Sequence, residues 1–212
     1  MRQEKSEKIL ADRLGTLMNE LGSDKAKIGY HNIYAQCLEP YRHRKINMLE
    51  MGVHQGASLQ AWARYMPKAF IVGIDAINRL KQGVIGPRMA MHVGLQEDFE
   101  FLNRVSHKYG GFDIIIDDCG HQWRPQQLAL ETLWPHLRRG GLYIIEDLGT
   151  SYRPEWRGDA KINTVDFLHK YVEYAVQDAD RVGELEHVQF FSNMCILKKS
   201  RIGTGFINRW KE

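Results

Sequence analysis

The sequence lacks the features that define several classes of protein. It has only three cysteines in 212 residues, with no CxxC pair among them, so neither a disulfide framework nor a zinc ribbon is expected. No apolar run approaches the roughly 20 residues that a membrane-spanning helix needs. We therefore expect a cytoplasmic protein, because unpaired thiols suit a reducing compartment, and we expect no membrane partner.

The chain also lacks a strong charge of either sign. It carries 29 basic and 26 acidic side chains, which gives a formal net charge of +3. The basic residues form no stripe of the kind that binds nucleic acid, so no nucleic-acid partner is expected. The first eight residues are charged and have no apolar core, so we expect no secretory signal there.

Apolar residues follow two different patterns along the chain. Helical spacing from Ile9 to Leu21, then a short segment from Tyr30 to Leu38, predicts an N-terminal helical extension over residues 1–45. From residue 46, strand-like runs alternate with helical ones. The predicted strands are 46–50, 70–75, 89–93, 112–117 and 142–145, and the predicted helices are 58–65, 98–109, 126–137 and 165–176.

The alternation predicts an α/β fold over residues 46–200, because strands separated by helices form βαβ units. The expected sheet is doubly wound and mostly parallel. Two short β runs flank Ser192-Asn193 and predict a closing hairpin that adds an antiparallel strand. Gly140-Gly141 is predicted to stop the helix before the fifth strand, and residues 201–212 are expected to form a solvated tail.

The turn after the first predicted strand, EMGVHQGAS at 50–58, has the composition of a nucleoside site. Gly52 and Gly56 permit a tight turn and close approach of a ligand, and the following helix offers free N–H groups. His54 replaces the middle glycine of the dinucleotide fingerprint, which counts against NAD. Asp75 ends the second strand, where an acid can bind ribose hydroxyls. The alternative is a turn whose glycines have no ligand.

Acidic residues also end the fourth and fifth predicted strands. Asp117 and Asp118 follow one, Glu146 and Asp147 follow the other, and His121 comes shortly after. Strand ends of a parallel sheet share one edge, so we expect these groups in one crevice. Such carboxylates repel one another, and Mg²⁺, Ca²⁺ or Mn²⁺ would neutralise them. The last two acids can share a metal only if their strand has already ended. The alternative is that these acids cap helices or lie in solvent.

Together these motifs resemble a known family. LEMGVHQGASLQAW, IVGID, FDIIIDDCGH and GGLYIIEDLGTSY are similar to class I S-adenosylmethionine-dependent methyltransferases. They look most like the metal-dependent sugar O-methyltransferases of antibiotic biosynthesis, which include the macrocin, mycinamicin and rhamnosyl O-methyltransferases. The family's N-terminal motif is matched by GSDK at 22–25 and by Tyr30, His31 and Tyr34. The resemblance covers residues 20–200 and implies a Rossmann-like fold.

The resemblance also implies roles for individual residues. Asp118, Glu146 and Asp147 would bind Mg²⁺, and the catalytic groups would be Asp118 and His121, with His121 or a carboxylate as the base. Gln96 would lie near the adenine of S-adenosylmethionine. The full set implied for cofactor binding is Glu50, Gly52, Gly56, Ser58, Asp75, Gln96, Asp117, Tyr30 and His31.

The expected function is transfer of the methyl group of S-adenosylmethionine to a hydroxyl of a small molecule, a sugar or another vicinal diol, with the help of Mg²⁺. A catechol-type phenol is an alternative acceptor. An NAD-binding oxidoreductase and a catalytically silent scaffold are alternatives of other classes. Tyr152 and Trp156 follow the last acidic pair and would either line an acceptor pocket or belong to the core. A homo-oligomer is also left open.

Overall fold

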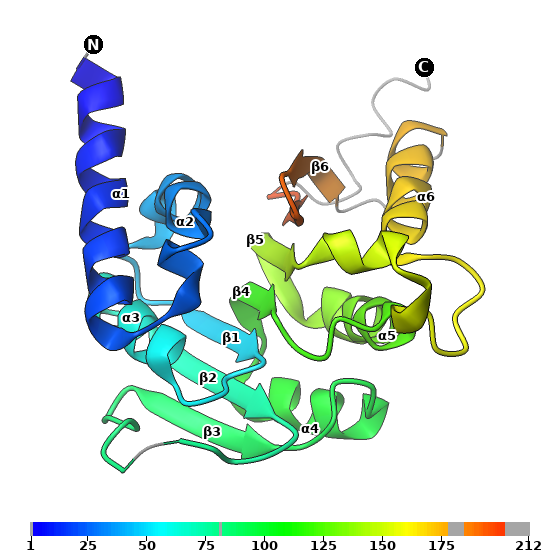
Figure 1. The fold of residues 1–212 in the computed structure, drawn as a ribbon, viewed down its shortest axis with the longest axis horizontal. Coiled ribbons are helices and arrows are strands. Elements are labelled where there is room, and N and C mark those ends of the chain that lie inside the picture. Colours follow the sequence, from blue (N-terminus) through cyan, green and yellow to red (C-terminus); the bar gives the residue numbers. More distant parts are fainter. Residues whose placement is uncertain (1, 81, 178–184, 202–212) are drawn as a thin grey trace.

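A computed structural model shows a seven-stranded sheet with helices on both faces (Figure 1). The structure describes residues 2–80, 82–177 and 185–201. The strands lie in the order β3-β2-β1-β4-β5-β7-β6, with β1 to β5 parallel and β7 antiparallel to β5. Their bounds are β1 (Asn47–Met51), β2 (Phe70–Asp75), β3 (Met89–Val93), β4 (Phe112–Asp117), β5 (Leu137–Glu146), β6 (Leu185–Phe191) and β7 (Met194–Lys199). The predicted mostly parallel sheet with a C-terminal hairpin is confirmed.

The helices divide into two groups. The main helices are α1 (Arg2–Leu21), α2 (Tyr30–Leu38), α3 (Ala57–Tyr65), α4 (Phe99–Tyr109), α5 (Trp123–Leu133) and α6 (Thr164–Gln177). Short 3-10 turns are η1 (Asp24–Ala26), η2 (Glu39–Tyr41), η3 (Trp134–His136), η4 (Leu148–Tyr152) and η5 (Pro154–Trp156). Among the residues described, no helix combines the length and apolarity needed to cross a bilayer.

Each face of the sheet has its own hydrophobic core, because successive strand residues point to opposite faces. Ile114 and Ile116 of β4 pack with α1, α2 and α3, while Ile115 packs with α4, α5 and α6. Leu14 of α1 and Tyr34 of α2 belong to the first core and are fully buried. The N-terminal helices therefore share a core with the sheet. The domain boundaries at residues 45 and 200 stay predictions.

The structure overturns the expected end of one helix. The helix predicted over 126–137 ends at Leu133, and Pro135 lies in the 3-10 turn that follows it. Gly140 and Gly141 do not stop the helix but lie inside β5. Gly140 has φ +73, and the register between β4 and β5 shifts at the start of β5. The glycines thus mark an irregularity in the strand, where glycine often occurs.

The remaining predicted elements are present, with ends displaced by a few residues. The first helix is the main exception, since α1 begins at Arg2 rather than Ile9. Asn193 has φ +63 in the turn between β6 and β7, which suits the hairpin predicted there. The predicted tail 201–212 lies outside the described residues, except for Arg201.

Candidate functional site

The ends of β1 and β4 lie side by side where the strand order reverses. The N–H of Asp118 donates to the carbonyl of Met51 at 3.0 Å. Gly52 has φ +88, and a Cβ there would overlap the Asp118 carbonyl and lie 2.9 Å from Cα of Cys119. Only glycine fits this crossing. An α/β sheet binds its ligands at such a switch point.

A pocket of about 640 Å³ opens at this switch point, a size suited to a small-molecule ligand. Its walls come from four segments and one strand end: 22–25, residues within 52–58, residues within 75–79, 118–121 and Asp147. The two sequence motifs, one rich in glycine and one rich in acids, therefore face a common space. The pocket also includes the GSDK segment, which comes from the N-terminal region.

Asp75 holds the glycine-containing turn. Its Oδ2 accepts hydrogen bonds from the N–H groups of Val53 at 3.0 Å and His54 at 2.8 Å, and its Oδ1 accepts one from Ile77 at 3.1 Å. The side chain still lines the pocket. A carboxylate has about four lone-pair sites, so Asp75 can fix the turn and still accept from a ligand.

Glu50 supports the same turn from below the pocket. It is fully buried, and it accepts hydrogen bonds from Ser58 Oγ at 2.9 Å and Trp62 Nε1 at 3.1 Å. Burial raises the pKa of Glu50 to about 7, although the Lys25 ammonium opposes the rise. Ser58 lines the pocket, whereas Glu50 and Gly56 do not. Gly56 instead takes φ +83 at the start of α3.

Gln96 and Asp117 form a buried pair behind the pocket wall. Gln96 Nε2 donates to Asp117 Oδ1 at 2.5 Å, and the hydroxyl of Tyr143 donates to the other oxygen at 3.4 Å. Burial raises the pKa of Asp117 to about 8. Neither residue lines the pocket. Gln96 Oε1 is buried without a hydrogen-bond partner, 3.4 Å from where a Cβ on Gly120 would lie, so an unused acceptor lies just behind the wall.

Asp118, His121 and Asp147 meet at the far end of the pocket. Their ligand atoms lie within 4.8 Å of one another. His121 Nε2 is 3.4 Å from Asp147 Oδ2 and 4.0 Å from Asp118 Oδ1. Asp147 and His121 have φ of +57 and +50, so both lie in turns and not in regular strands. The strand was expected to end ahead of both acids, but Glu146 is the last residue of β5 and only Asp147 lies beyond it.

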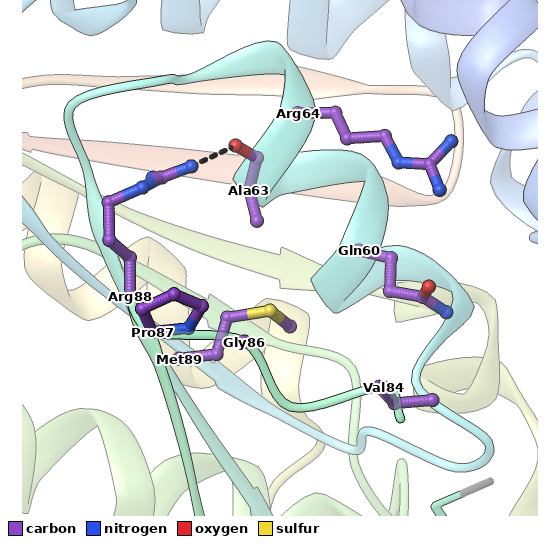
Figure 2. A pocket seen from close by; sticks show the side chains of 8 residues that line it. All are labelled: Gln60, Ala63, Arg64, Val84, Gly86, Pro87, Arg88 and Met89. Carbon is purple, nitrogen blue, oxygen red and sulfur yellow. Dashed lines mark hydrogen bonds between the residues drawn. The ribbon is translucent and has the colours of Figure 1, made fainter. Parts of the chain in front are cut away.

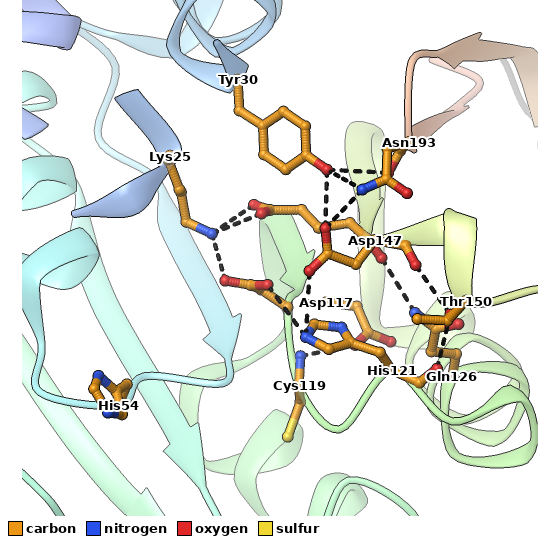
Figure 3. Close-up of polar contacts among 12 residues, drawn as sticks. Lys25, Tyr30, His54, Asp117, Cys119, His121, Gln126, Asp147, Thr150 and Asn193 are labelled. Atoms are coloured by element: carbon orange, nitrogen blue, oxygen red, sulfur yellow. Dashed lines mark hydrogen bonds and ion pairs between the residues drawn. The ribbon is translucent and has the colours of Figure 1, made fainter. Parts of the chain in front are cut away.

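Lys25, to which sequence reasoning gave no role, lies within the acidic cluster. Its Nζ is 2.5 Å from Asp118 Oδ2 and 2.7 and 2.8 Å from the two oxygens of Glu146. Dashed lines in Figure 3 join Lys25 to carboxylate oxygens. Glu146 also accepts from the Tyr34 hydroxyl and lies outside the close group of Asp118, His121 and Asp147. Burial lowers the pKa of Lys25, but the nearby carboxylates outweigh burial and raise it above its ordinary value. The one signal for Lys25 was its place in the GSDK motif.

Asp147 is held from two sides. The Tyr30 hydroxyl donates to its Oδ1 at 3.0 Å, and Asn193 Nδ2 donates to the same oxygen at 2.8 Å (Figure 3). Asn193 also donates to the Tyr30 oxygen at 2.8 Å. Sequence reasoning missed Asn193, because a hairpin turn gives no sign of which side chain it faces. His31 is not brought to the pocket, since its ring packs against Gly15 of α1.

The donor groups at this end suit a hard divalent cation. Carboxylate oxygens are the ligands that Mg²⁺ prefers, and three of them are supplied here by Asp118, Glu146 and Asp147. The ammonium of Lys25 is already held between two of these residues, which shows that the cluster accommodates positive charge. The same geometry leaves His121 Nε2 facing the carboxylates, while its Nδ1 is buried with no partner in the structure.

A second, smaller hollow of about 210 Å³ lies between α3 and the segment before β3 (Figure 2). Arg88 donates to the carbonyl oxygens of Ala63 and Met66 at the end of α3 and to that of Ala69 just before β2. The guanidinium thus satisfies backbone groups that a helix end leaves unpaired. This hollow has a structural explanation and lacks a cluster of reactive groups.

Comparison with known proteins identifies relatives, although no protein-family model matches the chain. The chain is 33% identical over 219 aligned residues to 8-demethyl-8-(2-methoxy-alpha-L-rhamnosyl)-tetracenomycin-C 3'-O-methyltransferase of Streptomyces olivaceus, covering 92% of this chain and 55% of that protein. It is 38% identical over 134 residues to mycinamicin VI 2''-O-methyltransferase of Micromonospora griseorubida, covering 60% of this chain and 33% of that protein. The chain thus spans about half the length of the curated relative that it matches almost throughout.

The fold has a counterpart among solved structures. The methyltransferase MycE of the mycinamycin biosynthetic pathway, solved with Mg, SAH and mycinamycin VI, matches with a TM-score of 0.80 and 29% identity. The match covers 89% of this chain and 54% of that one. The sheet and its helices therefore form a Rossmann-like methyltransferase fold, as the motifs implied.

Proposed function

Because this chain is related over 92% of its length to a sugar O-methyltransferase, we propose that it carries out S-adenosylmethionine- and Mg²⁺-dependent methylation of a sugar hydroxyl. The observation that carries the proposal is the meeting of Asp118, His121 and Asp147 at one end of a pocket whose other wall is the Gly52 turn. One space then holds the glycine-containing turn and the acidic cluster, so a methyl donor on the turn would lie close to a hydroxyl at the cluster.

The glycine-containing wall would hold the methyl donor. Asp75 has acceptor capacity left for ribose hydroxyls, and Ser58 lines the same wall. Gln96 Oε1, buried without a partner, would accept a hydrogen bond from the adenine if the wall at Gly120 opens slightly. When bound, S-adenosylmethionine supplies a methyl group on a positively charged sulfur. The wall's own task is to fix that group, since orientation alone can contribute several kcal/mol.

The acidic wall would hold Mg²⁺ through Asp118, Glu146 and Asp147. When bound, the ion lowers the pKa of a coordinated hydroxyl and orients it. Tyr34 donates to Glu146, and Tyr30 and Asn193 donate to Asp147. These three hydrogen bonds would orient the carboxylates, and such bonds to metal ligands commonly raise metal affinity.

His121 would act as the general base. Its Nε2 faces Asp118 and Asp147, and it would accept the acceptor's hydroxyl proton as the oxygen–methyl bond forms and the sulfur–methyl bond breaks. The Trp156 ring lies 6.1 Å from the His121 ring, and Tyr152 is 73% exposed. The Trp156 ring would offer an apolar surface for one face of a sugar, and the exposure of Tyr152 shows that it does not belong to the core.

Thermal unfolding tests the proposal without knowledge of the acceptor. The protein is heated with S-adenosylhomocysteine or NAD, each with Mg²⁺ or with EDTA. A ligand at about 100 times its Kd stabilises by roughly 2.7 kcal/mol, which raises the midpoint by several degrees at about 2–4 °C per kcal/mol. We expect a shift with S-adenosylhomocysteine and a separate one with Mg²⁺. A shift with NAD alone would overturn the proposal.

Asp118→Ala tests the metal site directly. We expect the variant to lose Mg²⁺-dependent turnover in a screen of sugar and catechol acceptors, and to bind S-adenosylhomocysteine as the wild type does. Asp12→Ala, at an exposed position of α1, is the matched control and should change neither property. Full activity of Asp118→Ala would refute the metal assignment, and activity on catechols alone would replace the sugar by a phenol.

A further inference from the structure

The Lys25 ammonium occupies a position between two of the proposed metal ligands. The side chain is 2% exposed, and its Nζ makes three contacts of 2.5 to 2.8 Å to Asp118 and Glu146. An ammonium has three N–H donors, so all three are used by these two carboxylates. Lys25 thus supplies charge compensation that a bound cation would also supply.

Groups other than Lys25 also hold these residues in the site. The Asp118 backbone is fixed by the hydrogen bond to Met51, and Glu146 is held by the Tyr34 hydroxyl. Asp147 is held by Tyr30 and Asn193. Removing the ammonium would therefore leave the Asp118 backbone, Glu146 and Asp147 with these anchors, while it takes a positive charge from the site.

We propose that Lys25 is the resident counter-cation of Asp118 and Glu146 and competes with the metal ion for these two carboxylates. The inference rests on the proposed Mg²⁺ site. Without metal, Lys25 offsets the repulsion between the half-buried Asp118 and the buried Glu146. A bound divalent ion must share the carboxylates of Asp118 and Glu146 with the Lys25 ammonium or displace it. The ion would also be repelled by this positive charge. Lys25 therefore weakens the apparent affinity for Mg²⁺. It also stabilises the two carboxylates when no metal is bound.

The test is Mg²⁺ binding by isothermal titration calorimetry on protein freed of metal with EDTA and then dialysed. Lys25→Met should lower the apparent Kd for Mg²⁺ by about 10-fold, because charges a few ångströms apart interact by more than 1.4 kcal/mol at a protein surface. Without metal its unfolding midpoint should fall by several degrees, and saturating Mg²⁺ should narrow this gap. Lys27→Met removes the same charge from an exposed position two residues away and should leave both quantities unchanged.

Lys25→Gln provides a second variant that retains one donor and lacks the charge, and it should bind Mg²⁺ more tightly as well. It decides the question if Lys25→Met fails to fold. Unchanged or weaker Mg²⁺ binding in the folded variants, with clear binding in the wild type, would overturn the inference and leave the proposed function standing. A wild-type protein that binds no divalent cation would overturn both.

Discussion

The two walls of the pocket are built by different means. The wall after β1 is made by the backbone, with Gly52 at φ +88 and N–H groups that Asp75 gathers. The wall after β4 and β5 is made by side chains, and its acids are held by Lys25 and Tyr30 from the N-terminal region. The first wall is therefore local in sequence, whereas the second depends on contacts between residues about a hundred positions apart.

The two walls should therefore respond differently to substitutions. A wall made by the backbone loses its shape when a substituted residue cannot adopt the required φ and ψ angles, and ligand binding is then lost entirely. A side-chain wall can lose one hydrogen bond and keep its shape, so its failures should be graded. Four variants test this contrast, in order of decreasing expected effect.

Gly52→Ala should have the largest effect, because Gly52 joins the two walls. Its added Cβ would overlap backbone atoms of Asp118, and the positive φ adds strain. We expect a loss of about 3 kcal/mol or more in unfolding free energy, together with loss of both S-adenosylhomocysteine and Mg²⁺ binding. Urea unfolding and calorimetry measure these quantities.

Gly83→Ala is the matched control for this variant. Gly83 has φ +81, yet a Cβ there meets nothing within 4 Å, so the substitution adds strain without a clash. It should cost only about 1–2 kcal/mol and keep both ligands. Equal losses in the two variants would mean that strain alone matters and that the contact between Gly52 and Asp118 does not.

His121→Gln should separate chemistry from binding at the side-chain wall. We expect turnover to fall by about 10²–10⁴-fold, the usual contribution of a general base, while the affinities for S-adenosylhomocysteine and Mg²⁺ stay near those of the wild type. His43→Gln, at an exposed position, should leave turnover unchanged. Wild-type turnover in His121→Gln would transfer the role of base to a carboxylate.

The contrast between the walls also explains how much the sequence could predict. The glycines, Asp75 and the acids at 117–118 and 146–147 stand at strand ends, and each follows a short apolar run of the kind that forms a buried strand. The sheet was therefore predictable, with the Gly140-Gly141 irregularity in β5 as the error. A pair of glycines occurs both at the end of a helix and at an irregularity in a strand, so this pattern alone does not distinguish the two.

The rest of the site could not be read from the chain. Lys25 and Asn193 touch the acids across more than 40 residues of sequence, and no local pattern encodes such partners. His31 was expected near a ligand and packs on α1 instead, because residues adjacent on a helix point in different directions. Gln96 and Asp117 were placed at the right strand ends but lie behind the wall.

Glu50→Gln tests whether the buried carboxyl group beneath the backbone wall makes stability depend on pH. Burial raises the pKa of Glu50 from 4.5 to about 7, so the native state keeps a proton that the unfolded state releases between these values. The stabilisation from this proton is full below about pH 4.5 and is lost as the pH rises through 7. The wild type should therefore lose about 3 kcal/mol relative to Glu50→Gln across that range. Urea unfolding in EDTA at several pH values measures the difference, and a difference independent of pH would contradict the prediction.

Tyr30→Phe should have the smallest effect and the most selective one. It removes one donor to Asp147 and leaves Asn193 in place on the same oxygen. Loss of an outer hydrogen bond to a metal ligand costs at least about 10-fold in metal affinity, so Mg²⁺ binding should weaken near that lower limit while S-adenosylhomocysteine binding stays unchanged. Tyr109→Phe also loses a hydroxyl contact, to His92 of the edge strand β3, and should leave Mg²⁺ binding unaltered. If Tyr30→Phe weakened the binding of Mg²⁺ and of S-adenosylhomocysteine equally, the two walls would not be independent. The prediction that the side-chain wall loses affinity in small steps would then be wrong.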